Sequence, residues 1–145
     1  MPQIQHLVVS SAPPAAIYPL IARGTGFAQW WAADVWGGTD APDTVALGFF
    51  GRQTVYQLRI ASHTPRQQIA WRCETGREWA DTTLAFQLEQ RDASTLIHFV
   101  HRDWKEETEY FRQCNTTWGE LMFRLKAAAE GKAPGPLFTL DGLAM

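Results

Sequence analysis

The chain has 145 residues, of which 46% are hydrophobic and 19% charged, and its formal net charge is −2. This length and composition predict one globular domain and exclude a disordered chain. The sequence has no basic cluster for nucleic acid or an anionic membrane, no apolar run near the ~20 residues of a membrane span and no signal-peptide pattern, so we expect a cytoplasmic protein.

The first expected elements are a strand and two short helices. Residues 3–11 alternate in polarity and are rich in β-branched side chains, which predicts a strand. Ser11, which precedes two prolines, predicts a hydroxyl-capped helix start, and Gly24 predicts the end of that helix. A second short helix is expected over residues 27–32, which include two tryptophans.

The central part of the chain predicts an antiparallel sheet. Gly37–Gly38 marks a turn, and the later breaks between apolar segments are short. Short breaks connect antiparallel neighbours, because parallel strands need a crossover of about a dozen residues. The strands of this meander are expected over residues 44–51, 54–62, 68–74, 81–90 and 94–103.

The last expected element is a long amphipathic helix over residues 108–130. Its apolar residues recur at spacings of three and four and form one stripe, and Gly131 is placed as a stop. A single sheet must cover its apolar face, and only this helix is long enough to do so. We therefore expect an α+β helix-grip domain over residues 1–132. In it a curved, six- to seven-stranded antiparallel sheet wraps around the helix, and residues 133–145 form a loose tail.

This order of elements resembles the helix-grip (SRPBCC) superfamily of START and Bet v 1-like proteins, and within it the branch of the activator of Hsp90 ATPase homologue. The match rests on the opening strand and helix, Trp30–Trp31, Gly37–Gly38 and the segment Thr117-Trp118-Gly119, and it covers residues 3–131. The resemblance implies a cavity between the sheet and the long helix that holds an apolar or aromatic small molecule in many members. It does not imply an enzyme.

Aromatic residues make up 12% of the chain and are expected on inward faces or near the mouth of the fold. Each ring by itself is most simply a core residue. Together, rigid rings on a curved sheet are hard to pack without voids, which predicts an apolar pocket. The candidate ligand-binding residues are Trp30, Trp31, Trp36, Phe49, Tyr56, Trp71, Phe86, His98, Phe111, Cys114, Trp118 and Met122.

Polar residues predict neither a metal site nor a cofactor. His98 and His101 lie three apart on one expected strand, so they point to opposite faces and cannot share a metal ion, although one of them can face the cavity. Asp34 follows two tryptophans and is expected to have a raised pKa from desolvation. Cys73 and Cys114 are expected to point inward, most simply as buried thiols.

Three functions fit this pattern. The favoured one is binding of a small apolar or aromatic molecule in the cavity. The alternative is a cyclase-, dehydratase- or hydrolase-type enzyme for an aromatic or polyketide-like substrate, with His98, Asp34 or Tyr110 as general acid or base but without a catalytic constellation. A co-chaperone-like interaction module is disfavoured, since no second domain accompanies this one. We expect no nucleic-acid or membrane partner, and a homodimer is compatible with the sequence.

Overall fold

The structure is a computed structural model that describes residues 1–37 and 43–143. Its main element is one seven-stranded antiparallel sheet. The strands are β1 (Ile4–Ser10), β2 (Asp34–Trp36), β3 (Thr44–Phe49), β4 (Thr54–Thr64), β5 (Gln68–Cys73), β6 (Thr83–Arg91) and β7 (Ser94–Arg102). Their order across the sheet is β1-β7-β6-β5-β4-β3-β2. The predicted meander is therefore confirmed, and β1 and β2 form the two edges.

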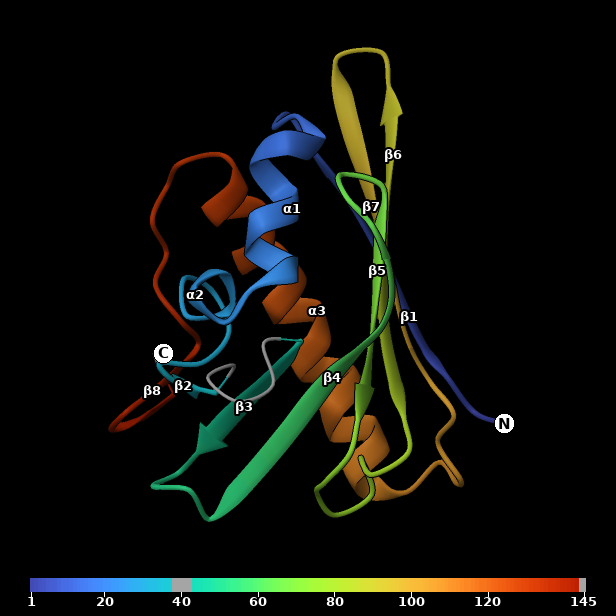
Figure 1. The fold of residues 1–145 in the computed structure, drawn as a ribbon, viewed down its shortest axis with the longest axis vertical. Coiled ribbons are helices and arrows are strands. Elements are labelled where there is room, and N and C mark those ends of the chain that lie inside the picture. The colour runs from blue at the N-terminus through green and yellow to red at the C-terminus, as the bar shows by residue number, and fades with distance from the viewer. Residues whose placement is uncertain (38–42, 144–145) are drawn as a thin grey trace.

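Three helices lie within the described ranges: α1 (Pro14–Ala22), α2 (Gly24–Phe27) and α3 (Glu109–Ala129). Figure 1 shows the sheet curving around α3, with α1 packed beside one end of that helix. None of these helices is long and apolar enough to cross a membrane. The predicted apolar stripe of α3 is buried and comprises Phe111, Cys114, Trp118, Leu121, Met122 and Leu125. The α+β helix-grip architecture is confirmed.

The short helices begin and end differently from the expectation. Pro13 is the residue that precedes α1, and no side chain caps this helix, so the predicted Ser11 cap is wrong. The second helix ends at Phe27, before the tryptophans that it was expected to carry. This helix packs closely against α1, because a Cβ at Gly26 would overlap the carbonyl oxygen of Pro19. Of the predicted turn at Gly37–Gly38, Gly38 lies outside the described residues.

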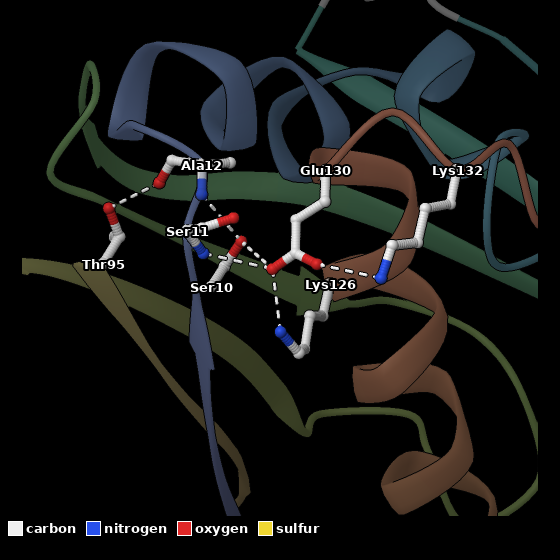
Figure 2. Close-up of polar contacts among 7 residues, drawn as sticks. All are labelled: Ser10, Ser11, Ala12, Thr95, Lys126, Glu130 and Lys132. Carbon is white, nitrogen blue, oxygen red and sulfur yellow. Dashed lines mark hydrogen bonds and ion pairs between the residues drawn. The ribbon is translucent and has the colours of Figure 1, made fainter. Parts of the chain in front are cut away.

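Glu130, at the end of α3, connects this helix to the end of β1 (Figure 2). One carboxylate oxygen accepts hydrogen bonds from Ser10 Oγ at 3.0 Å, from the Ser11 backbone N–H at 3.1 Å and from Lys126 Nζ at 2.8 Å. The other oxygen lies 3.5 Å from Lys132 Nζ. The Lys126 ammonium, followed by the Ser11 amide, holds the pKa of Glu130 down to about 2. This carboxylate therefore fixes one end of the helix that the sheet surrounds.

The C-terminal tail is packed rather than loose over the part that the structure describes. Leu137 is only 3% exposed. Phe138 donates its backbone N–H to the Trp31 carbonyl at 3.0 Å and accepts from the Ala33 N–H at 2.9 Å. The tail continues into a small hairpin of β8 (Phe138–Thr139) and β9 (Gly142–Leu143), which lies near β2 in Figure 1. The loose-tail expectation is thus wrong here, because backbone hydrogen bonds and apolar burial hold residues 137 and 138.

Candidate ligand-binding groove

An apolar groove of about 610 Å³ opens between β3, β4, the N-terminal half of α3 and the C-terminal tail. Residues of β3 and β4 form one side of the groove, residues of the first half of α3 form another, and the C-terminal tail closes a third. Leu121 and Leu137 add aliphatic surface. The aromatic residues of its wall include Trp31, Phe49, Tyr56, Trp79, Trp118 and Phe138.

Three of the aromatic rings lie nearly parallel. The Tyr56 and Trp79 rings stack with centroids 3.9 Å apart at an angle of 7°. Trp79 and Trp118 lie 6.1 Å apart at 17°. Gly76 leaves room for the Tyr56 ring in this stack, because a Cβ at Gly76 would overlap that ring. The groove therefore has a flat aromatic wall.

Four polar side chains meet in this wall, and we call Tyr56, Trp79, Tyr110 and Cys114 the donor cluster. The hydroxyl groups of Tyr56 and Tyr110 share a hydrogen bond. Burial raises the pKa of Tyr110 to about 12 and the pKa of the Cys114 thiol to about 11, and the nearby Trp79 N–H and Tyr110 hydroxyl lower the pKa of the thiol only in part. Burial, together with the hydrogen bond to Tyr110, also raises the pKa of Tyr56. All four groups are therefore uncharged at neutral pH.

A buried histidine supports two rings of the wall from behind. Trp118 donates its indole N–H to Nδ1 of His101 at 3.2 Å. Nε2 of His101 therefore carries the proton and donates it to Thr82 Oγ1 at 2.8 Å, and Thr82 donates to the Trp79 carbonyl at 2.6 Å. Burial lowers the pKa of His101 to about 3, so the ring is neutral. This chain of hydrogen bonds holds Trp79 and Trp118 in place.

The structure brings five of the twelve sequence-predicted site residues together in the groove. They come from four separate segments: the turn after α2, β3, β4 and α3. Cys114 and Cys73 are both free and buried, and the Cys73 thiol donates to the Thr75 carbonyl at 3.0 Å. The five predicted residues in the groove are Trp31, Phe49, Tyr56, Cys114 and Trp118.

Five other predicted residues are part of the packed core and do not line the groove. Trp30 donates its indole N–H to the Leu20 carbonyl at 2.8 Å, and Trp71 donates to the Ile21 carbonyl at 2.9 Å. Both tryptophans thus fix α1 against the core, with no polar hydrogen left for a ligand. The core set comprises Trp30, Trp71, Phe86, Phe111 and Met122.

The two remaining predicted residues lie away from the groove. The guanidinium of Arg52 stacks 3.8 Å from the centre of the Trp36 ring at the sheet edge. His98 lies on the outer face of the sheet and pairs with Glu89 at 3.0 Å, so it does not face the cavity as proposed from the sequence. Asp34 also differs from the expectation. Its pKa is lowered rather than raised, because Arg52 donates a hydrogen bond to its carboxylate at 2.9 Å.

Several groove residues were missed by the sequence analysis. Trp79 lies between two expected strands and Phe138 lies in the tail, so neither had a predicted inward face. Tyr110 was considered only as a catalytic candidate. The sequence signal that could have identified Trp79 and Phe138 is a large aromatic residue in a segment between strands or in the tail, where an exposed ring is unfavourable. Among the described residues, no group of three or more His, Cys, Asp or Glu side chains could hold a metal ion.

No family model matches the chain, and no curated protein sequence matches it either. Solved structures do match. The Aha1 dimer from Colwellia psychrerythraea is 27% identical, with a TM-score of 0.78 over 91% of this chain and 98% of that chain. A START superfamily protein from Mycobacterium smegmatis is 15% identical, with a TM-score of 0.68 over 89% of this chain and 97% of that chain. DynU16, a protein of the dynemicin biosynthetic locus, is 14% identical, with a TM-score of 0.74 over 94% of this chain and 50% of that chain.

These similarities agree with the arrangement that the coordinates show. The seven-stranded sheet, the two short helices after β1 and the long helix α3 occur here in the order expected for a helix-grip protein. The chain therefore has the helix-grip fold, and by this fold it is similar to the Aha1 dimer from Colwellia psychrerythraea and to the START superfamily protein from Mycobacterium smegmatis.

Proposed function

We propose that this protein binds a small apolar or aromatic molecule in the groove between β3, β4, α3 and the C-terminal tail. The observation that carries the proposal is the flat aromatic wall, in which Tyr56 and Trp79 stack at 3.9 Å beside a groove of about 610 Å³. Apolar pockets of this size with a few convergent polar groups are typical ligand sites. Burial of an apolar ligand contributes about 25 cal/mol per Å² before ordering costs.

Binding is favoured over catalysis by the protonation state of the donor cluster in the groove. A general base must be able to accept a proton at working pH. The Tyr110 hydroxyl and the Cys114 thiol both keep their protons at neutral pH, since burial raises their pKa values to about 12 and about 11. The other two catalytic candidates, His98 and Asp34, do not line the groove. An enzyme-type role for an aromatic or polyketide-like substrate is therefore the weaker proposal.

A fluorescence titration with 1-aminoanthracene, an uncharged tricyclic probe, tests the binding function. We expect saturable quenching of tryptophan emission with one site per chain. Thr117 lines the groove on α3, so Thr117→Trp should fill it and weaken binding about tenfold or more. Phe123 is 63% exposed on the same helix and does not line the groove, so Phe123→Trp serves as the matched control. Absence of saturable binding, or equal binding by both variants, would overturn the proposal.

We also propose that two copies of the chain associate through β1. This strand pairs with β7 on one side and forms an edge of the sheet (Figure 1). Leu7 is 53% exposed and Val9 48% exposed, and β1 carries no Asp, Glu, Lys or Arg. Charged residues commonly protect such edges from pairing, so their absence favours an antiparallel β1–β1 contact, which is two-fold symmetric. The similar protein from Colwellia psychrerythraea is described as a dimer, which agrees with this proposal.

A further inference from the structure

We infer that the groove selects flat aromatic ligands that are uncharged and carry a hydrogen-bond acceptor such as a carbonyl oxygen, which the donor cluster recognises. This inference rests on the proposed ligand-binding function and adds the chemical class of the ligand. It depends on three features of the groove: an excess of donors, a lack of cations and a flat wall.

The excess of donors is centred on Cys114. The indole nitrogen of Trp79 is buried, the residue is 4% exposed, and this N–H has no nitrogen or oxygen acceptor among the described residues. The Trp79 N–H and the Tyr110 hydroxyl are both near the Cys114 sulfur, and both favour its thiolate form by lowering the pKa of the thiol. A thiol sulfur is a weak acceptor, and a buried donor without a good acceptor is unfavourable. An acceptor oxygen on a ligand beside Cys114 would give these donors a stronger partner.

The tyrosine pair adds to this excess. Two hydroxyl groups have two hydrogens, and the bond between Tyr56 and Tyr110 uses one of them. Both phenols remain protonated at neutral pH, because burial raises their pKa values. The second hydrogen is therefore available to a ligand acceptor or to the weakly accepting sulfur of Cys114.

The groove lacks a group that would neutralise an anion. Among the described residues that line it, none is Lys, Arg or His. The charged residue in the lining is Glu120, whose side chain is 55% exposed at the mouth and lies 3.5 Å from Arg124. A buried carboxylate without a cation is unfavourable, and Glu120 would repel it further. The groove should therefore prefer a ketone to a carboxylate of the same shape.

Three naphthalene derivatives of similar size test this selectivity. They are 2-acetylnaphthalene, with a neutral carbonyl, 2-ethylnaphthalene, with no acceptor, and 2-naphthoate, with a carboxylate. Dissociation constants are measured by calorimetry at pH 7.5 for the natural protein and for Tyr110→Phe. Tyr18→Phe is the matched control, since Tyr18 is a half-buried tyrosine on α1 outside the groove.

We expect Tyr110→Phe to weaken 2-acetylnaphthalene binding about fivefold to tenfold, the effect of one neutral hydrogen bond. Binding of 2-ethylnaphthalene should change less than about twofold, and 2-naphthoate should bind at least about tenfold more weakly than the ketone. Tyr18→Phe should change none of these values. In a spectrum of ¹⁵N-labelled indoles, the ketone alone should move the Trp79 N–H proton downfield, as hydrogen bonding requires.

Two results would overturn the inference while leaving the binding function intact. In the first, Tyr110→Phe weakens the ketone and the hydrocarbon equally, so the hydroxyl does not recognise the acceptor. In the second, 2-naphthoate binds as tightly as the ketone. If neither 1-aminoanthracene nor any of the three derivatives saturates the protein, the proposed function fails together with the inference.

Discussion

Trp118 donates its indole N–H to Nδ1 of His101, and this bond holds a fully buried histidine in its neutral form. A second proton on the imidazole would have to lie on Nδ1, directly against the indole hydrogen. Burial accordingly lowers the pKa of His101 from 6.5 to about 3. The unfolded chain therefore binds a proton at this residue below about pH 6.5, while the folded chain does not.

Stability should decrease as the pH falls from 7 to 5. Because the pKa of His101 is lower in the folded state, stability is fully present above 6.5 and is lost as the pH falls toward 3. Linkage gives about 2 kcal/mol between pH 7 and pH 5 from this one group. Urea unfolding at the two pH values measures it. His101→Gln should remove most of this dependence, whereas His63→Gln, at an exposed position on β4, should preserve it. An unchanged pH dependence in His101→Gln would contradict the assignment.

The sequence predicted those elements whose apolar residues repeat regularly. The spacing from Phe111 to Leu125 placed α3, and alternating polarity placed the strands. It could not predict contacts between elements that are distant along the chain. Gly26 looks like a loop residue, but its missing side chain lets α2 approach the carbonyl of Pro19. Pro134 and Gly135 looked like a loose tail, but Arg124 donates to both of their carbonyls, at 3.2 Å and 2.8 Å.

For the same reason, only five of the twelve residues predicted from the sequence line the groove. Residues on regular inward faces, such as Phe49 and Trp118, line it as expected. Trp79 was missed because the inward position of a loop residue depends on tertiary packing, here its stack with Tyr56. His98 was misplaced because strand alternation gives two opposite faces without saying which of them is inside.

Gly76→Ala should disturb the aromatic wall. Gly76 has a φ of 108°, and its Cβ would overlap the ring of Tyr56. We expect a loss of about 2 kcal/mol in unfolding free energy, from backbone strain and displacement of the ring, together with weaker 1-aminoanthracene binding. Gly131→Ala is the control, because Gly131 also has a positive φ, 80°, but no atom lies near its missing Cβ. If both substitutions affect binding equally, Gly76 does not position Tyr56.

Glu130→Ala should weaken the connection between α3 and β1 shown in Figure 2. The substitution leaves the Ser10 hydroxyl and the Ser11 amide without their charged acceptor. We expect the free energy of unfolding to decrease by about 1 to 2 kcal/mol, the usual effect of losing hydrogen bonds to a half-buried charged group. Glu120→Ala removes another glutamate of α3, which is 55% exposed and pairs with Arg124, and should change stability by less than about 1 kcal/mol. Chemical denaturation of both variants at pH 7 measures the two losses of stability. Equal losses would contradict the role assigned to Glu130.

Phe138→Ala tests the tail as a wall of the groove. The Phe138 ring packs edge-on against Phe49, with centroids 4.9 Å apart at 89°. Its removal should weaken 1-aminoanthracene binding about threefold to tenfold, as expected for the loss of an aromatic contact. Leu140, in the same tail, is 74% exposed, and Leu140→Ala should bind the probe normally. Unchanged binding in Phe138→Ala would mean that the ligand lies deeper, against Tyr56 and Trp79.

Leu7→Lys should abolish association through β1. The side chain of Leu7 is half exposed at the middle of this edge strand, so in an antiparallel β1–β1 contact centred there the two lysines would lie side by side and repel each other. Because one pair of seven-residue strands buries little area, the dimer should depend on concentration, and sedimentation equilibrium at about 10 to 500 μM is a suitable measurement. Gln87→Lys is the matched control, since Gln87 is exposed on β6 in the interior of the sheet. A monomeric natural protein, or a dimer that persists in Leu7→Lys, would exclude this interface.

Ligand binding should be the same in Leu7→Lys as in the natural protein, because the groove lies toward the opposite edge of the sheet, beside β3 and β4.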